Sequence, residues 1–137
     1  MRLADLHGSV LVATSYDADT QEWVFAFTHD ITLRVAAAWR VVGPEGISIG
    51  WQDDGQWFGL AAPARVTDRV QRSCGGEVRR ATSEVGTGDL RIAFAAGGEL
   101  QVFNDSCGYE GWVLRGPGGS WIVGQGGGNV SRSPSDG

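Results

Sequence analysis

The chain has 137 residues, a formal net charge of −5 at pH 7, 42% hydrophobic residues and 20% charged residues. These values are those of a single globular domain and exclude an intrinsically disordered chain. The acidic balance argues against non-specific nucleic-acid binding and against anionic membranes, and no apolar run approaches the ~18 residues of a membrane span.

The N-terminus lacks a basic region followed by an apolar core, so we expect no signal peptide and a cytoplasmic location. In that compartment Cys74 and Cys107 are expected as free thiols, with a disulfide open only if the two lie close together. All basic residues are arginines. Residues 65–80 carry a charge of +3, which leaves −8 on the rest of the chain.

Alternating apolar residues predict strands over 10–16, 22–28 and 31–37. Asp17 to Thr20 reads as the first turn and His29-Asp30 as the second connection. Residues 39–42 extend the third strand or begin a new one, and 43–46 form a turn.

In the middle of the chain, Asp53-Asp54-Gly55 predicts a hairpin between strands 47–51 and 57–60. One short helix is expected at about residues 64–73, because Val66, Val70 and Cys74 recur at helical spacing and glycines follow.

Strands are then predicted over residues 78–84, 90–95, 99–103, 112–115 and 121–123. Gly97-Gly98 suits the tight turn of a hairpin between the second and third of these. The single β-rich domain is expected to span residues 1–125, and the Gly/Ser-rich residues 126–137 are expected to form a disordered tail.

The two halves repeat the same pattern. The residues Gly8, Val10 and Thr14 match Gly76, Val78 and Thr82 at an offset of 68, and Phe27, Leu33 and Val35 match Phe94, Leu100 and Val102 at an offset of 67. This predicts a mainly β fold of antiparallel meanders with an internal pseudo-two-fold repeat, its halves at about 8–42 and 76–115. The sheet is expected to be curved or to close into a barrel-like shape.

No residue of the chain is predicted to be catalytic. His29-Asp30 is better explained as a turn than as an acid–base pair. The two histidines, His7 and His29, and the two cysteines lack the spacing of zinc motifs, and Cys107 has no nucleophile signature. The run from Asp17 to Glu22 lacks the glycine of a calcium loop. No metal and no cofactor are predicted.

The C-terminal part carries Tyr109-Glu110-Gly111-Trp112, then Gly116-Pro117-Gly118-Gly119, then Gly126-Gly127-Gly128. This signature resembles the end of an uncharacterised bacterial domain family with a Y-E-x-W strand, a G-P-x-G turn and a final G-G. The resemblance implies kinship of fold and little chemistry. Glu110 is the polar residue that it singles out, for pairing with Arg40 or Arg115 at a core edge or for binding.

Three functions follow as hypotheses. The first is a small acidic interaction protein, of immunity type or regulatory, that binds a protein partner. The second is a small-molecule-binding barrel protein or enzyme with a pocket near Tyr109 and Glu110, lined by Trp23, Trp39 and Trp112. The absence of a catalytic motif favours a non-enzymatic role and leaves catalysis open. The third is a homodimer that buries the arginine-bearing helix. The candidate binding residues are Trp39, Arg40, Arg65, Arg69, Arg72, Tyr109, Glu110 and Trp112.

Overall fold

The structure is a computed structural model that describes residues 1–134. Over this range the chain forms eleven strands in two antiparallel sheets, one α-helix and three short 3-10 segments. The strands are β1 (Leu11–Asp17), β2 (Glu22–Phe27), β3 (Ile31–Val35), β4 (Ala38–Gly43), β5 (Gly46–Gly50), β6 (Val78–Ser83), β7 (Leu90–Phe94), β8 (Glu99–Phe103), β9 (Trp112–Arg115), β10 (Trp121–Gly124) and β11 (Val130–Arg132). The helical segments are η1 (Leu3–Leu6), α1 (Val66–Ser73), η2 (Pro117–Gly119) and η3 (Gly126–Gly128).

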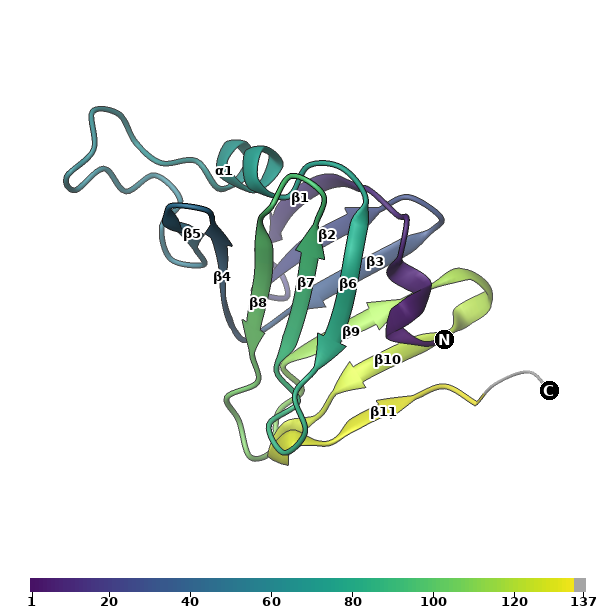
Figure 1. Cartoon of the computed structure of the whole chain (residues 1–137). Coiled ribbons are helices and arrows are strands. Elements are labelled where there is room, and N and C mark those ends of the chain that lie inside the picture. The colour runs from purple at the N-terminus through teal and green to yellow at the C-terminus, as the bar shows by residue number, and fades with distance from the viewer. Residues whose placement is uncertain (135–137) are drawn as a thin grey trace.

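Each half of the chain contributes strands to both sheets. The six-stranded sheet has the order β1-β2-β3-β9-β10-β11, and the five-stranded sheet has the order β5-β4-β8-β7-β6 (Figure 1). The first meander, β1-β2-β3, is therefore extended by strands from the second half. The second meander, β6-β7-β8, is extended by the β4–β5 hairpin from the first half. The predicted antiparallel, mainly β fold is confirmed, as curved sheets and not as a closed barrel.

Strand register defines the internal repeat residue by residue. Trp39 of β4 pairs with Val102 of β8, and Trp112 of β9 pairs with Val35 of β3. Val102 follows Val35 by 67 positions, whereas Trp112 follows Trp39 by 73. The hairpins β4–β5 and β9–β10 are thus equivalent, and the second half carries six additional residues before Trp112.

The predicted offset of 68 for the first strand is wrong. Both first strands carry a bulge at the same place, between Leu11 and Ala13 in β1 and between Val78 and Arg80 in β6. This register gives an offset of 67 from the first strand through the third. Matching glycine, valine and threonine by type misplaced the first strand by one position, because residue type alone does not fix strand register.

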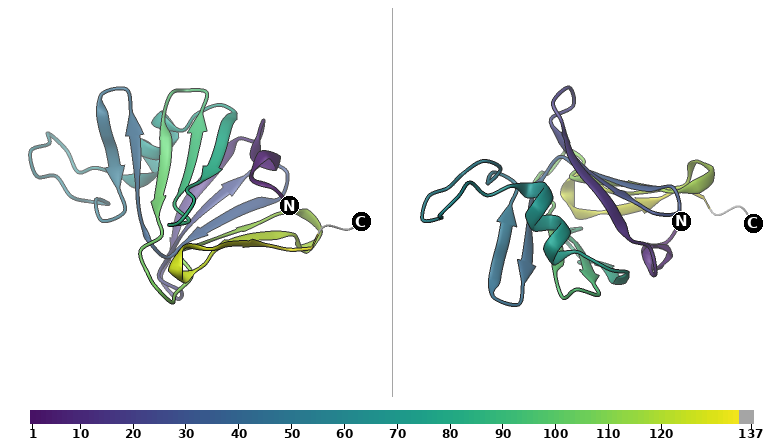
Figure 2. Two further views of the ribbon diagram at one scale, coloured as in Figure 1. Left: turned by 60° about the horizontal axis from the view of Figure 1, so that its bottom comes forward. Right: turned by 90° about the horizontal axis from the view of Figure 1, so that it is seen from above.

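The core lies between the two sheets, which form separate layers inclined to one another (Figure 2). Alternate residues of the strands point inward and are buried; the largest fully buried side chains include Trp39, Trp112, Phe25, Leu33 and Leu100. Each such side chain contributes about 1.5–3 kcal/mol of burial free energy relative to exposure. The alternation seen in the sequence is therefore the pattern of one shared core.

Helix α1 was predicted over 64–73 and is confirmed from Val66 to Ser73. It begins two residues late, because Arg65 keeps an extended backbone with φ −120° and ψ 125°. The side chain of Asp54 accepts a hydrogen bond from the Val66 N–H at 3.0 Å and so caps the helix from a distant loop. Val66 and Val70 are buried, and Cys74 forms the C-cap.

The predicted hairpin around Asp53-Asp54-Gly55 is wrong. Strand β5 pairs only with β4, and the residues between β5 and α1 form a loop that projects from the body of the protein (Figure 1). The base of this loop is tied to the approach to α1 instead. Gly55 donates to the Ala64 carbonyl at 2.7 Å, and Ala64 donates to the Gln56 carbonyl at 2.7 Å.

The prediction of a disordered tail from residue 126 onward is also wrong for residues 126–134. Strand β11 pairs with β10, matching Val130 with Gly124 and Arg132 with Ile122. The edge of β10 offers unpaired backbone groups, and their hydrogen bonds order a segment with little apolar content. The remaining three residues of the predicted tail lie outside the described part of the chain. None of the helices in residues 1–134 has the length and apolar character to cross a membrane.

Candidate functional site

Two crossover segments carry the chain from one sheet to the other, and they differ in length. Ala36 and Ala37 join β3 to β4, whereas residues 104–111 join β8 to β9. The carbonyl of Gly111 accepts hydrogen bonds from the backbone N–H groups of Ala36 at 2.9 Å and Ala37 at 3.2 Å. The additional residues of the second half are therefore held against the short crossover of the first half.

A hollow of about 350 Å³ opens on one side of the short crossover, between the ends of the two sheets. We call it the aromatic hollow. Its side-chain lining consists of Tyr16, Gln21, Trp23, Val35, Trp51, Gln52 and Asp54, together with Ala36 and Ala37. Three aromatic rings from three separate segments thus share one opening with a single carboxylate.

The aromatic rings continue from this opening into the core. Tyr16 and Trp23 are cross-strand partners whose ring centroids lie 5.2 Å apart, at an interplanar angle of 58°. Trp23 meets Trp39 edge-on at 5.5 Å, and Trp39 meets Phe25 edge-on at 5.2 Å. Tilted and edge-on arrangements at these distances are favourable for aromatic pairs. The inner rings therefore fix the position of Trp23 at the wall of the hollow.

A second hollow, of about 590 Å³, is also lined by Ala36 and Ala37, and we call it the acidic hollow. It is lined by Asp105, Tyr109, Glu110 and the backbone around them. The Ser106 hydroxyl accepts the N–H groups of Gly108 at 3.1 Å and Tyr109 at 2.9 Å, which fixes the local turn. The Tyr109 side chain itself is 84% exposed.

Asn104 anchors the start of this long crossover. Its side-chain amide donates to the carbonyls of Thr87 at 2.9 Å and Gln125 at 2.7 Å, and its backbone N–H donates to Asp89 at 2.8 Å. Gly127 adds a hydrogen bond to the Ser106 carbonyl at 2.8 Å. The acidic hollow therefore rests on a segment that is held by the C-terminal strands.

The two ends of the pseudo-symmetric fold differ. We call the end that contains Trp112 the closed end and the end that contains Trp39 and the aromatic hollow the open end. At one end the Trp112 indole donates from Nε1 to the Gly88 carbonyl at 2.8 Å. Its counterpart Trp39 has a buried Nε1 with no hydrogen-bond partner among the described residues. Gln21 occupies the position of Gly88, and both have left-handed backbones, with φ 59° and 74°. The indole of Trp112 is thus hydrogen-bonded, and the indole of its counterpart Trp39, beside the aromatic hollow, is not.

Glu110 and the aromatic residues that the sequence suggested for a site lie in three different places. Tyr109 and Glu110 both line the acidic hollow, near the predicted place. Trp39 and Trp112 are each 1% exposed and belong to the core, not to a pocket wall. Trp23 does line a pocket, the aromatic hollow.

The expected pairing of Glu110 with Arg40 or Arg115 is not formed among residues 1–134. Arg40 donates from Nε to the Gln101 side chain at 2.8 Å, and its guanidinium lies 5.1 Å from the centre of the Phe103 ring. Glu110 is exposed, so its charge faces the solvent of the acidic hollow.

The helix arginines do not join this site. Arg69 donates to the Ser48 carbonyl at 3.2 Å and so fastens α1 to β5. Arg65 precedes the helix and Arg72 is exposed in its last turn. Neither hollow is lined by them, and a homodimer through this helix stays a prediction.

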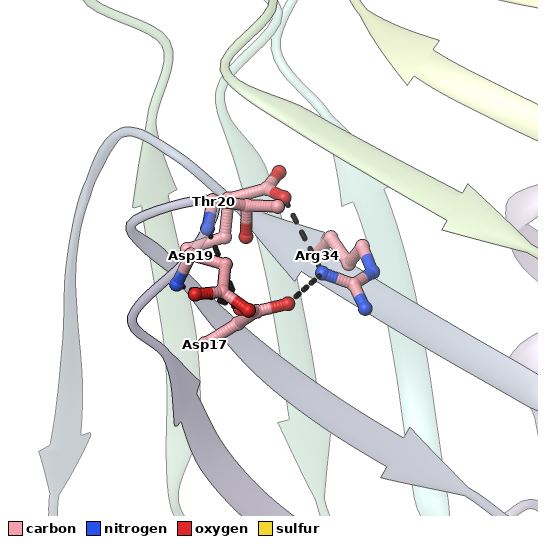
Figure 3. Close-up of polar contacts among 5 residues, drawn as sticks. Asp17, Asp19, Thr20 and Arg34 are labelled. Carbon is pink, nitrogen blue, oxygen red and sulfur yellow. Dashed lines mark hydrogen bonds and ion pairs between the residues drawn. The ribbon is translucent and has the colours of Figure 1, made fainter.

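The two turns of the first meander, at His29-Asp30 and at Asp17, have structural roles. His29 and Asp30 form the predicted turn between β2 and β3, with φ 65° and 58°. Asp17 accepts the N–H groups of Asp19 at 3.1 Å and Thr20 at 3.4 Å, and the Arg34 guanidinium donates to it at 3.1 Å (Figure 3).

The hydrogen bond from Arg34, followed by those from the backbone, lowers the pKa of Asp17. Arg34 also contacts Glu22 at 3.4 Å, so one guanidinium pairs with two of the carboxylates in the run from Asp17 to Glu22. Within residues 1–134, no group of three or more histidine, cysteine, aspartate or glutamate side chains is placed to hold a metal ion.

Sequence reasoning missed Tyr16, Trp51 and Asp54 as site residues. Trp51 and Asp54 were assigned to a hairpin that does not form. The comparison of the halves contains the useful signal, because the positions of Tyr16, Trp23 and Trp51 hold Ser83, Leu90 and Gly124 in the other half. Aromatic residues that only one repeat carries, near a strand end, indicate a function beyond core packing.

No protein-family model, curated protein or solved structure matches this chain. The resemblance to a bacterial domain family therefore stays a prediction.

Proposed function

We propose that this protein is a small acidic interaction protein that binds a basic segment of a protein partner along the two hollows. The observation that carries the proposal is their combined lining. The aromatic residues are Tyr16, Trp23, Trp51 and Tyr109, the acidic residues are Asp54, Asp105 and Glu110, and no arginine is among them.

The charge of the chain supports the same partner. The net charge is −5, and an acidic surface steers a basic partner mainly through the rate of association. Tyrosine and tryptophan supply large contact areas with few rotatable bonds, which is why they are common at the centres of interfaces. Ala36 and Ala37 line both hollows, so a segment that binds along the two would cross these small side chains.

Fluorescence anisotropy with a labelled peptide of about ten residues tests this proposal. One peptide carries four arginines, and its partner peptide carries citrulline at the same positions. We expect the arginine peptide to bind more tightly and its Kd to rise with salt, since exposed charges are screened within about 10 Å at 0.1 M ionic strength.

The double variant Asp105→Asn/Glu110→Gln should weaken binding of the arginine peptide by about tenfold, through two lost charge contacts of about 0.7 kcal/mol each. Asp30→Asn/Glu45→Gln is the matched control, because both residues are exposed turn residues outside the hollows. Equal affinity for the citrulline peptide, or an equal loss in the control, contradicts the proposal.

A further inference from the structure

We propose that the aromatic hollow binds an alkylated ammonium group, held between aromatic faces and balanced by the carboxylate of Asp54. This deepens the proposed function, on which it rests where the ammonium belongs to a side chain of the partner. The same chemistry is presented by a methylated lysine and by a free quaternary ammonium compound, and the experiment below separates these two sources.

The rings of the hollow are available to a ligand. Tyr16 is 51% exposed and Trp51 is 43% exposed, while Trp23 is half-buried and is held edge-on against Trp39. Tyrosine and tryptophan faces carry negative potential and attract a cation placed over them. Three such rings from β1, β2 and the segment after β5 line one opening of about 350 Å³, which exceeds one ammonium head and leaves space for its alkyl stem.

The charge of the lining favours a positively charged ligand. Asp54 is the one ionisable acid in the hollow, and the other polar side chains are the neutral amides Gln21 and Gln52, apart from the Tyr16 hydroxyl. The Val66 N–H holds Asp54 through one oxygen at 3.0 Å, so the carboxylate is fixed by helix α1. A hard metal ion needs more oxygen ligands than one carboxylate supplies. A weakly hydrated alkylated ammonium needs only aromatic faces and one nearby negative charge.

The internal repeat shows that the fold does not require these rings. At the closed end of the molecule the equivalent positions hold Ser83, Leu90 and Gly124. There a C-terminal glycine turn packs over the strand ends, and a Cβ atom at Gly128 would collide with the Gly86 carbonyl. The aromatic residues occur only at the end that stays open. This is the expected distribution for ring residues that contact a ligand, and it is independent of the charge argument.

The experiment titrates the full chain with choline and with its neutral carbon isostere, 3,3-dimethyl-1-butanol, and follows the tryptophan indole resonances by NMR. We expect choline to shift the resonances of Trp23 and Trp51 with a Kd of about 1 mM, and the isostere to bind at least tenfold more weakly. A second arm compares peptides that are identical except for trimethyl-lysine, lysine or arginine at one position. Preference for trimethyl-lysine identifies a partner side chain as the source, and choline binding without that preference identifies a small molecule.

Two pairs of variants locate the effect. Trp51→Ala should reduce choline affinity at least tenfold, while Trp57→Ala, on the projecting loop and 65% exposed, should not change it. Asp54→Asn should reduce it about threefold or more, because asparagine keeps the oxygen that caps α1 and loses the charge; Glu45→Gln should have no effect.

The outcomes of the two proposals are distinguishable. Equal binding of choline and its isostere, or equal losses in Trp51→Ala and Trp57→Ala, overturns this inference. Binding of arginine peptides without any response to choline or trimethyl-lysine overturns it as well, while the proposed binding of a basic partner stands. Choline binding with no affinity for any basic peptide supports the ammonium site and removes the protein partner.

Discussion

Val10 and Glu77 occupy the same position in the two halves of the chain and form an antiparallel bridge with each other. Two equivalent residues that pair with one another lie on the axis that relates the halves, as at a symmetric dimer interface. Beside them Gly8 donates to the Val78 carbonyl at 3.0 Å, and Val78 donates to the Ser9 carbonyl at 2.8 Å. The bridge lies directly before β1 and β6, the first strands of the two halves, so backbone hydrogen bonds join the halves to each other at this axis.

The two equivalent tryptophans provide the first prediction. Trp112→Phe removes the indole bond to Gly88 and leaves that buried carbonyl without its donor, whereas Trp39→Phe removes an Nε1 that has no partner. The loss of ring volume is common to both variants. We therefore expect Trp112→Phe to lower the free energy of unfolding by about 1–3 kcal/mol more than Trp39→Phe. Urea denaturation with unchanged m-values measures the difference, and equal losses in the two variants would contradict the assignment.

Close packing at the closed end gives the second prediction. A Cβ atom at Gly124 would overlap the indole of Trp112, while one at Gly43 would meet nothing closer than 3.8 Å. Neither glycine has a left-handed φ, so backbone strain does not enter the comparison. Gly124→Ala should cost about 1–3 kcal/mol of stability and Gly43→Ala within about 0.5 kcal/mol. Thermal unfolding of the pair is the measurement, and a tolerated alanine at Gly124 would show that the Trp112 ring can move.

The sequence predicts most strands because each strand buries one face, so apolar alternation records it directly. The hairpin around Asp54 fails for a physical reason, since the carboxylate that suits a turn is used to cap α1. Strand β11 was missed because its order comes from backbone hydrogen bonds to β10, which apolar content does not record.

The candidate site is less predictable than the fold. Tyr109 and Glu110 were predicted from the C-terminal signature that contains them, and both line the acidic hollow. Trp51 was not predicted, because its role depends on how the end of β5 faces Tyr16 and Trp23 across the two sheets. Such a contact between segments distant in the sequence leaves no periodic pattern, and only the difference between the repeats indicates it.

The two cysteines are predicted to differ in reactivity. Burial raises the pKa of the Cys74 thiol to about 12, and Cys107 is exposed. A thiol reagent should modify Cys107 in the native protein and reach Cys74 only on unfolding, since the thiolate is the nucleophile. Mass spectrometry with and without denaturant checks both residues, and rapid native labelling of Cys74 would contradict its place in the core.

The same burial predicts a loss of stability at alkaline pH. The folded state keeps the Cys74 proton while the unfolded state releases it above its ordinary pKa, so the contribution is complete below pH ~8.5 and declines as the pH rises toward 12. Cys74→Ala should be less stable overall, with a flatter dependence between pH 8.5 and 10.5. Cys107→Ala is the control and should keep the slope of the unsubstituted chain. Parallel slopes for all three chains would show that Cys74 ionises in the folded state.

The ion pair on the outer face of the first meander gives the last prediction. Because Arg34 donates to Asp17 at 3.1 Å and lowers its pKa, the ionised carboxylate stabilises the fold above the pKa of the unfolded chain, and this contribution is lost as the pH falls through the lower folded pKa. Arg34→Gln should raise the pKa of Asp17 and reduce the acid-induced loss of stability that this residue causes. A carboxyl-carbon NMR titration of Asp17 measures the shift. Arg91→Gln, which removes the 3.4 Å pair with Glu99 on the other sheet, is the matched control and should leave Asp17 unchanged. If the pKa of Asp17 stays low without Arg34, the backbone N–H groups of Asp19 and Thr20 are sufficient to hold it there.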